Sequence, residues 1–437
     1  MGKNPKRAVV VGALVGIVMA GSLGVILSER WNRSAAAIPP AERREAVAAP
    51  DLAYVPTSIG APVSEFGRPA VTNVHLADLD LDGLLDVLYC EAQLNTVRWI
   101  RQSPRGMFTE RVIGEDIPGP AHVWAGDVSG NGRLDVLVAS MGQITPNNDR
   151  IGAVVALENL DNRRFRSRVL SERIARVSDV RGANLSGHAD ERLDLVIGQF
   201  GYSQGETRWM QNKGGWNFES HLVSTLSGCV HTPVADFDGD GRIDFAALIS
   251  QEWEEIYLFR NPGAGGDFRG QVIWGSINED YGCSGLEAAD INRDGKPDLI
   301  YTNGDGFDYA GSGSRPWHGV QWLENLGEGR FEFHRVGDMP GAYAPCVADL
   351  NGDGFLDVLA ASAFADWSDP AAVSMKAWLN DGLQNFTEVV LAQRPTHLVT
   401  AAVGDLDGNG VPVIVTGGFH FNPPYDNMSN ITVWRRK

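Results

Sequence analysis

Short apolar runs alternate with acidic, glycine-rich turns along most of this chain. The stretch "VADFDGDGRIDFAALIS", from Val234 to Ser250, carries aspartates at alternate positions, then a glycine, then an aspartate directly before an apolar run. Runs such as "DVLYC", "DVLVAS" and "DLIYTNG" occupy the equivalent place elsewhere, and their apolar, β-branched composition favours strands. The pattern therefore predicts β-hairpins whose turns are acidic loops.

The acidic turn recurs at regular spacing. Its first position falls at Asp78, Asp127, Asn184, Asp236, Asp290, Asp349 and Asp405, which are 49 to 59 residues apart. Each copy continues into a third apolar segment, such as "VRWIRQ", and a fourth short run, such as "TERVI". Repeats of about 40–50 residues with four strands are the sequence sign of propeller blades. The sequence thus predicts an all-β, seven-bladed β-propeller over residues 51–437.

The two ends of the repeat array complement each other. The seventh unit stops after "ITVWRRK" without a fourth strand, and "AYVPTSI" precedes the first unit. We expect this early segment to supply the outer strand of blade seven, since a closed ring leaves no open sheet edge. Trp99, Trp209, Trp322 and Trp378 recur at one position per repeat, which predicts that they belong to the core.

The loops place oxygen ligands in an order that suits a hard divalent cation. Ca²⁺ takes six to eight oxygens at about 2.3–2.6 Å. The loop can supply these oxygens from the side chains at positions 1, 3, 5 and 9 and from the carbonyl of position 7. A glycine at position 6 permits the sharp turn. Unlike an EF-hand, each loop runs directly into a strand, so it predicts a metal-clasped hairpin.

These phased loops resemble the FG-GAP/VCBS repeat family, whose best-known members are the propellers of integrin α-subunits. The resemblance implies about four to six structural Ca²⁺ ions. The positions matching the family's ligands are Asp78, Asp80, Asp82 and Asp86; Asp127, Ser129, Asn131 and Asp135; Asp236, Asp238, Asp240 and Asp244; Asp290, Asn292, Asp294 and Asp298; Asp349, Asn351, Asp353 and Asp357; and Asp405, Asp407 and Asn409.

Two blades depart from the ligand pattern. Blade three has an insertion and His188 where a carboxylate is expected, so we do not expect it to bind metal. In blade seven Val413 replaces the closing aspartate. For every loop the alternative is a tight polar turn without an ion.

The N-terminal segment has a different character. Residues 1–7 are basic, and residues 8–27 carry no charge over 20 positions, which as a helix spans about the 30 Å of a bilayer core. We expect one uncleaved transmembrane helix at 8–27 and a linker at 28–50, with a cleaved signal peptide as the alternative. The basic residues 1–7 favour a cytoplasmic N-terminus and a propeller on the periplasmic or extracellular side.

Composition narrows the classes of function. The formal net charge is −18 and no basic patch is visible, which argues against a nucleic-acid partner. No G-x-S-x-G, H-E-x-x-H, C-x-x-C or phosphate-binding glycine loop occurs, so no catalytic residue is predicted. His75, His122 and His231 lie three or five residues before their loops. They are either ordinary polar residues of the central channel or part of a site there.

The cysteines raise one structural hypothesis. Cys229 and Cys283 each lie seven residues before the loop of adjacent blades, so an inter-blade disulfide is possible outside the cytoplasm. Cys90 and Cys346 lie in other blades and are expected to be small buried apolar residues.

Long connections between second and third strands distinguish blades five, six and seven. They should emerge on the face opposite the acidic hairpins. Their aromatic residues lie outside the repeat pattern and form the expected partner-binding set: Phe307, Tyr309, Trp317, Trp367, Phe419 and Tyr425, with Phe421 beside them. The alternative is that these residues cap the core of the propeller.

We therefore expect a docking or assembly module, for example a subunit of a larger membrane complex, whose partners are other membrane or extracytoplasmic proteins. An adhesin or glycan-binding module and a propeller lyase or hydrolase are the alternatives.

Overall fold

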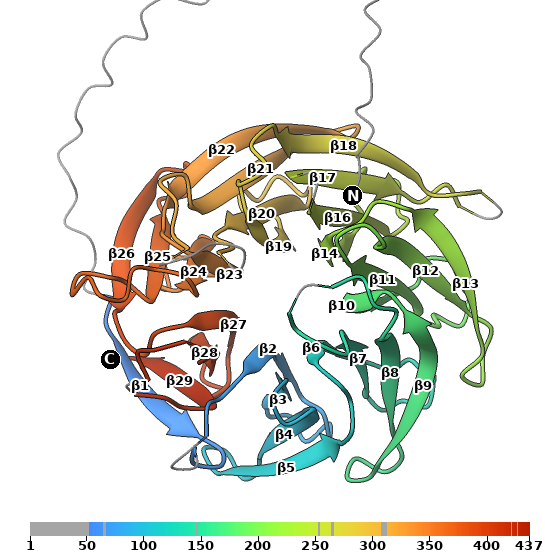
Figure 1. The fold of residues 1–437 in the computed structure, drawn as a ribbon, viewed down its shortest axis with the longest axis horizontal. Helices are drawn as coiled ribbons and strands as arrows, with labels where there is room; N and C mark the ends of the chain where they lie inside the picture. Colours follow the sequence, from blue (N-terminus) through green and yellow to red (C-terminus); the bar gives the residue numbers. More distant parts are fainter. Residues whose placement is uncertain are drawn as a thin grey trace, which may run out of the picture. The chain divides into compact units, whose positions relative to one another are not determined.

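The computed structural model describes residues 52–63, 67–145, 147–251, 254–263, 266–306, 313–420, 422–425 and 427–437. Seven antiparallel sheets are arranged around a central axis, as Figure 1 shows. The predicted all-β propeller with seven blades is confirmed. The expected anchor and linker lie outside the described residues, and within those residues no helix is long and apolar enough to cross a membrane. The anchor therefore stays a prediction.

Each blade has four strands from the axis outwards. The innermost strands are β2 (Val71–Ala77), β6 (Pro120–Gly126), β10 (Arg176–Ala183), the pair β14 (Cys229–His231) and β15 (Val234–Ala235), β19 (Cys283–Ala289), β23 (Ala342–Ala348) and β27 (Leu398–Gly404). The second strands are β3 (Asp86–Glu91), β7 (Asp135–Ser140), β11 (Asp194–Phe200), β16 (Asp244–Ser250), β20 (Asp298–Asn303), β24 (Asp357–Ser362) and β28 (Val413–Gly418).

The third strands are β4 (Thr96–Gln102), β8 (Gly152–Asn159), β12 (Glu206–Asn212), β17 (Glu254–Arg260), β21 (Gly319–Gly327), β25 (Met375–Asn380) and β29 (Ile431–Arg436). The outer strands are β5 (Phe108–Gly114), β9 (Phe165–Ile174), β13 (Phe218–Ser224), β18 (Arg269–Ser276), β22 (Arg330–Asp338), β26 (Phe386–Ala392) and β1 (Tyr54–Ile59).

Burial follows the position of a strand in its blade. Second strands such as β3 are buried at every residue, because a neighbouring blade covers each face. That explains their continuous apolar runs. Outer strands such as β13 are mostly half-buried or exposed, since they form the rim of the ring.

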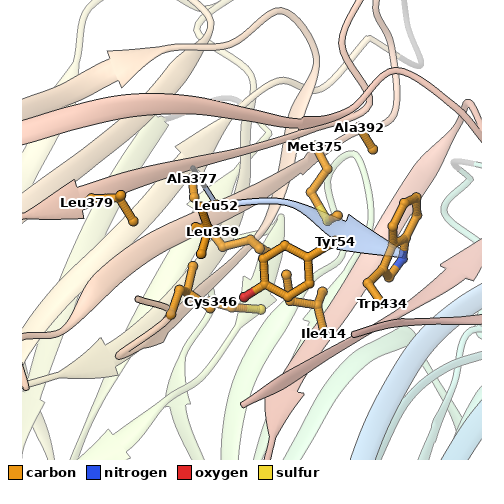
Figure 2. Packing of buried hydrophobic residues seen from close by; sticks show 11 residues of the cluster. Leu52, Tyr54, Cys346, Leu359, Met375, Ala377, Leu379, Ala392, Ile414 and Trp434 are labelled. Carbon is orange, nitrogen blue, oxygen red and sulfur yellow. The ribbon is translucent and has the colours of Figure 1, made fainter. Parts of the chain in front are cut away.

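The ring is closed by strands from both ends of the described chain. β1 pairs antiparallel with β29, from Tyr54 opposite Arg436 to Ile59 opposite Ile431, which confirms the predicted outer strand of blade seven. Figure 2 shows Leu52 and Tyr54 reaching into the apolar layer between blades six and seven. Closure thus adds core contacts as well as backbone hydrogen bonds.

Each pair of adjacent blades shares its own apolar cluster. One cluster joins Leu79 and Trp99 of blade one to Val136 of blade two, and six equivalent clusters complete the ring. Trp99, Trp322 and Trp378 are buried in these layers as predicted. Trp209 is half-buried and stacks on His221, with ring centroids 4.6 Å apart.

In each blade a side chain at the end of the third strand, or within two residues of it, ties the blade to the preceding one. We call these side chains the latch residues. The latch bonds are Gln102 Nε2 to Leu406 O (2.8 Å), Asn159 Nδ2 to Leu79 O (3.4 Å), Asn212 Nδ2 to Val128 O (3.1 Å), Asn261 Nδ2 to Leu185 O (2.7 Å), Asn325 Nδ2 to Phe237 O (2.8 Å) and Asn380 Nδ2 to Ile291 O (3.5 Å). Arg436 takes this role in blade seven, donating to the carbonyl of Asn351 at 2.7 Å.

The disulfide hypothesis is wrong in this structure. Cys229 and Cys283 are both free, buried thiols. Cys229 packs in the apolar layer between blades three and four, whereas Cys283 packs in the layer between blades four and five. Equivalent positions in adjacent blades therefore face different layers, with blade four between them. Cys90 and Cys346 are buried, as expected.

Candidate functional site

The acidic loops are organised by their first aspartate. In blade four the carboxylate of Asp236 accepts hydrogen bonds from the backbone N–H groups of Asp240 (3.1 Å) and Gly241 (2.8 Å). Gly241 has φ +84°, a conformation that disfavours other residues, which explains the glycine at position 6. Asp240 in turn accepts from the N–H of Arg242 at 2.9 Å. Blades one, two, five, six and seven repeat this arrangement.

The aspartate at position 9 connects the loop to the third strand. Asp244 has no exposed surface, and its carboxylate accepts from the N–H groups of Asn261 (2.7 Å) and Phe237 (3.1 Å). Burial raises the pKa of Asp244 to about 6, against these hydrogen bonds, which lower it. This residue thus has a structural role in the blade in addition to its predicted role as a ligand.

Two loops bring three carboxylates together. Oxygens of Asp78, Asp80 and Asp82 lie within 4.8 Å of one another, and so do those of Asp236, Asp238 and Asp244. Converging carboxylate oxygens are the donor set that Ca²⁺ prefers. The residues present therefore fit the expected ion in blades one and four.

Basic side chains already offset part of the loop charge. Arg101 lies 2.5 Å from Asp80 and 3.2 Å from Asp82. Lys296 pairs with Asp294, and Arg242 with Asp240. In blade seven both Nε and Nη2 of Arg435 bind Asp407, at 2.8 and 2.9 Å. A bound ion would have to share these carboxylates with the basic groups.

The loop of blade three is closed by hydrogen bonds. The N–H of His188 donates to Asn184 Oδ1 at 2.7 Å, and its Nε2 lies 3.3 Å from Asp194 Oδ1. The imidazole therefore contacts the position-9 carboxylate directly. That blade three does not bind metal stays a prediction.

The expected partner-binding residues have different environments. Phe307, Tyr309 and Phe421 lie outside the described residues. Trp317 is half-buried and donates from Nε1 to the carbonyl of Asp280 at 3.0 Å. Trp367 is half-buried 5.3 Å from the ring of His397.

Of the two described residues of this set in blade seven, one lies on the surface and the other lies in the core. Tyr425 is 38% exposed and carries the guanidinium of Arg68 4.3 Å from its ring centre. Phe419 is only 5% exposed and packs against Ala70 and Ala92. The expectation that Phe419 is exposed on a loop is therefore not met, because the residue lies directly after β28 and packs on the neighbouring blade.

A cavity of about 540 Å³ lies along the axis and is lined by the inner strands. His75, His122 and His231 line it, which agrees with a channel position. Arg181 and Glu287 line it too, and the sequence reasoning missed both. They lie three residues before their loops, as His75 does, so the repeat register was a signal that pointed to them.

A β-bulge in every inner strand sets which side chains face the channel. The register of β2 shifts between Val71 and Asn73, β6, β10, β14, β19 and β27 shift at the equivalent place, and β23 shifts between Tyr343 and Cys346. Bulges re-aim side chains. Most residues three and five before the loop line the channel, whereas Trp124, Asp179 and Pro233 do not.

A buried carboxylate organises the polar side of the channel. Asp179 has no exposed surface and accepts hydrogen bonds from Arg181 Nε (3.0 Å) and from the backbone N–H of Thr232 (2.6 Å). His122 Nδ1 lies 2.9 Å from its other oxygen. Burial alone would raise the pKa of Asp179, but Arg181 and His122 outweigh it and hold the pKa well below its usual value. Asp179 is thus ionised beneath the channel wall.

The N–H of Thr232 is available because the innermost strand of each sheet pairs with a strand on one side only. The equivalent N–H groups of Val74 and Val123 likewise donate to side chains of the preceding blade, Thr400 and Asn73, without a following proline. In blade four Pro233 follows Thr232 and separates β14 from β15. The N–H of Thr232 thus reaches into blade three.

Burial also changes the pKa values of three channel side chains. It lowers the pKa of His75 to about 3 and that of His231 to about 4. It raises the pKa of Glu287 to about 7, with Arg181 opposing the change. At neutral pH both imidazoles are uncharged, and Glu287 is near its midpoint.

Comparison with known proteins agrees with the fold. A family model described as "FG-GAP-like repeat" matches residues 72–138, 189–247, 236–301 and 302–360. Two similar solved chains come from crystal structures of BBS1N in complex with ARL6DN, one soaked with lead and one with mercury. They are 11% and 12% identical, with TM-scores of 0.52 and 0.53, and each match covers 88% of this chain and 96% of the other. At such identity the likeness shows the fold alone.

No curated protein sequence matches the chain. The family model, however, covers more than half of its length, and its repeats coincide with blades that carry the acidic hairpins. This chain therefore belongs to the FG-GAP-like repeat family.

Proposed function

We propose that this propeller is a docking module for partner proteins, held at a membrane by residues 8–27 and stabilised by Ca²⁺ in its hairpin loops. The observation that carries the proposal is the position of Trp317, Trp367 and Tyr425. They lie on connections between second and third strands of three consecutive blades, and these connections share one face of a propeller. Partly exposed aromatic side chains are enriched at protein interfaces.

Calcium is the second part of the proposal. The converging carboxylates of blades one and four support it, as does the repetition of the same turn around the ring. The ions would occupy the hairpin face and leave the opposite face for a partner. FG-GAP propellers generally act as interaction modules, which agrees with one face of the propeller being left for a partner.

The anchor is the third part, and the uncharged residues 8–27 support it. A single span would keep the propeller at the bilayer. Partners in the same membrane would then bind at high effective concentration.

The test is a triple variant, Trp317→Ala, Trp367→Ala and Tyr425→Ala, extracted as the full chain in mild detergent. Co-purifying proteins are identified by mass spectrometry, and folding is checked by thermal melting. The matched control is Leu81→Ala, Phe355→Ala and Val411→Ala, three exposed apolar residues on the hairpin face. We expect the first variant to lose partners that the control retains. A folded first variant that retains every partner would falsify the docking proposal.

A further inference from the structure

We propose that the central channel is a binding site for a small hydroxy-carboxylate, whose carboxylate pairs with the guanidinium of Arg181. The site is separate from the metal loops and from the docking face, by which we mean the face that carries Trp317, Trp367 and Tyr425. It is formed by side chains of the inner strands, which the docking proposal does not use.

The guanidinium of Arg181 is fixed at Nε, and its side chain is partly exposed to the cavity. Its Nε donates to the buried carboxylate of Asp179, while the side chain keeps 25% of its surface exposed and lines the cavity. Within the described part of the chain, no acceptor bonds its two terminal nitrogens. A guanidinium fixed through Nε presents a planar pair of donors, which matches the two oxygens of a carboxylate.

The charges of these layers argue against a ligand with more than one negative charge. Asp179 offsets the charge of Arg181, and Glu287 is the remaining ionisable carboxyl in these layers. A monocarboxylate adds only its own charge when Glu287 is protonated. A doubly charged anion such as sulfate would leave a larger excess of negative charge near two carboxyl groups. Glu279 and Asp305 line the cavity toward the docking face and further disfavour polyanions.

Arg176 also lines the cavity, at the opposite end of β10, but it is only 2% exposed. Its Nε and Nη2 donate to the carbonyls of Gln143 and Ile144, and its Nη1 is buried without a hydrogen-bond partner in the described structure. We therefore assign the ligand anion to Arg181, whose side chain is the more exposed of the two.

The neutral imidazoles suit hydroxyl groups. His75 and His231 line the same cavity, and an uncharged imidazole carries one donor and one acceptor. Val74, Leu286 and Val347 provide apolar wall. A volume of about 540 Å³ falls within the range of small-molecule pockets. Together these features favour a polyhydroxylated monocarboxylate over a fatty acid or a metal ion.

Isothermal titration calorimetry on the full chain in detergent tests the proposal. The probes are sodium D-gluconate, the uncharged sorbitol and sodium sulfate at pH 6.5. We expect saturable gluconate binding, with sorbitol and sulfate at least about tenfold weaker, because neither offers a singly charged carboxylate to the guanidinium of Arg181. Absence of saturable gluconate binding up to millimolar concentrations would overturn the proposal.

Variants identify the site. Arg181→Lys keeps the charge beside Asp179 but removes the planar fork, so we expect gluconate affinity to fall about tenfold. The control is Arg208→Ala in the same blade, an arginine of similar exposure that pairs with Glu206 outside the channel. We expect it to bind gluconate as the unaltered protein does. Equal affinity in Arg181→Lys would contradict the assignment.

Glu287→Gln tests the site independently if Arg181→Lys does not fold. At pH 8 it removes a negative charge from the cavity and should tighten gluconate binding severalfold, with little effect at pH 5.5. If neither pH shows a change in affinity, the carboxylate does not bind beside Glu287 and the proposal fails. Both results leave the docking proposal unaffected, since its test uses different residues and a different readout.

Discussion

Nδ2 of Asn325, at the end of the third strand of blade five, donates a 2.8 Å hydrogen bond to the carbonyl of Phe237 in blade four. Asn325 also donates to the carbonyl of Pro297 in its own blade, and it is fully buried. The same side chain therefore satisfies backbone acceptors in two neighbouring blades. The latch residues repeat this contact around the ring.

Asn325→Ala should lower the free energy of unfolding by about 1–3 kcal/mol, because two buried carbonyl acceptors lose their donor. Chemical denaturation monitored by fluorescence measures the change. The control is Asn217→Ala, an exposed asparagine whose Nδ2 bonds only within its own turn in the described structure, and it should change stability by less than about 0.5 kcal/mol. Equal effects of the two substitutions would show that the inter-blade bond contributes nothing.

Calcium removal should destabilise the propeller if the acidic loops bind the ion. A ligand at one hundred times its dissociation constant stabilises by about 2.7 kcal/mol per site. Excess EGTA should therefore lower the melting temperature strongly, and magnesium should restore it poorly because Mg²⁺ demands tighter octahedral geometry. A melting curve that EGTA does not move would contradict the calcium proposal.

One blade can be tested separately from the others. Asp240→Ala should reduce the difference between melting temperatures with calcium and with EGTA, since it removes one ligand of blade four. The control is Asp267→Ala, which changes an exposed aspartate of the same blade outside the loop. We expect that control to keep the full calcium response.

Removal of residues 1–60 should destabilise the ring much more than removal of residues 1–50. The longer deletion takes away β1, exposes the edge of β29 and removes Leu52 and Tyr54 from the cluster in Figure 2. Burying two such side chains is worth about 3–6 kcal/mol. Thermal melting and size-exclusion chromatography measure the loss, and an open edge favours aggregation. Similar melting of the two truncated proteins would mean that β1 does not stabilise the closed ring.

Stability should fall as the pH rises through the range where Glu287 ionises. Its usual pKa is 4.5, and burial raises the folded value to about 7. Between these values the unfolded chain releases the proton first, so the free energy of unfolding decreases with pH and levels off above pH 7. The full effect is at most about 3.5 kcal/mol, since each pKa unit corresponds to about 1.4 kcal/mol.

The titratable side chains of the other inner strands that line the channel with Glu287 are His75, His122, Arg181, His231 and Cys346. Asp179 is buried behind Arg181 and His122. Further toward the docking face the cavity is lined by Glu254, Glu279, Asp305 and Arg176. Glu287→Gln should match the unaltered protein near pH 4.5 and exceed its stability at pH 8. The exposed Glu115→Gln is the control and should not alter the pH profile. Parallel stability curves for Glu287→Gln and the unaltered protein would refute the prediction.

The local signals in the sequence were sufficient for the architecture. Each acidic turn and its two flanking strands form a hairpin of nearby residues, so their composition reports their structure directly. The recurrence of that hairpin with two further strands predicted the blades. The spare segment before blade one predicted closure by β1.

The channel and the docking face depended on contacts between distant residues. The bulge in each inner strand changes which side chains point to the axis, and simple alternation does not reveal it. Asp179 binds Thr232, 53 positions away, because the inner strands of adjacent blades lie side by side at the axis. The burial of Phe419 arises from Ala70 and Ala92 of the neighbouring blade. The repeated hairpins follow from the amino-acid pattern, because their hydrogen bonds are local. Only the closed ring decided which polar side chains meet, because that depends on how separate blades pack around one axis.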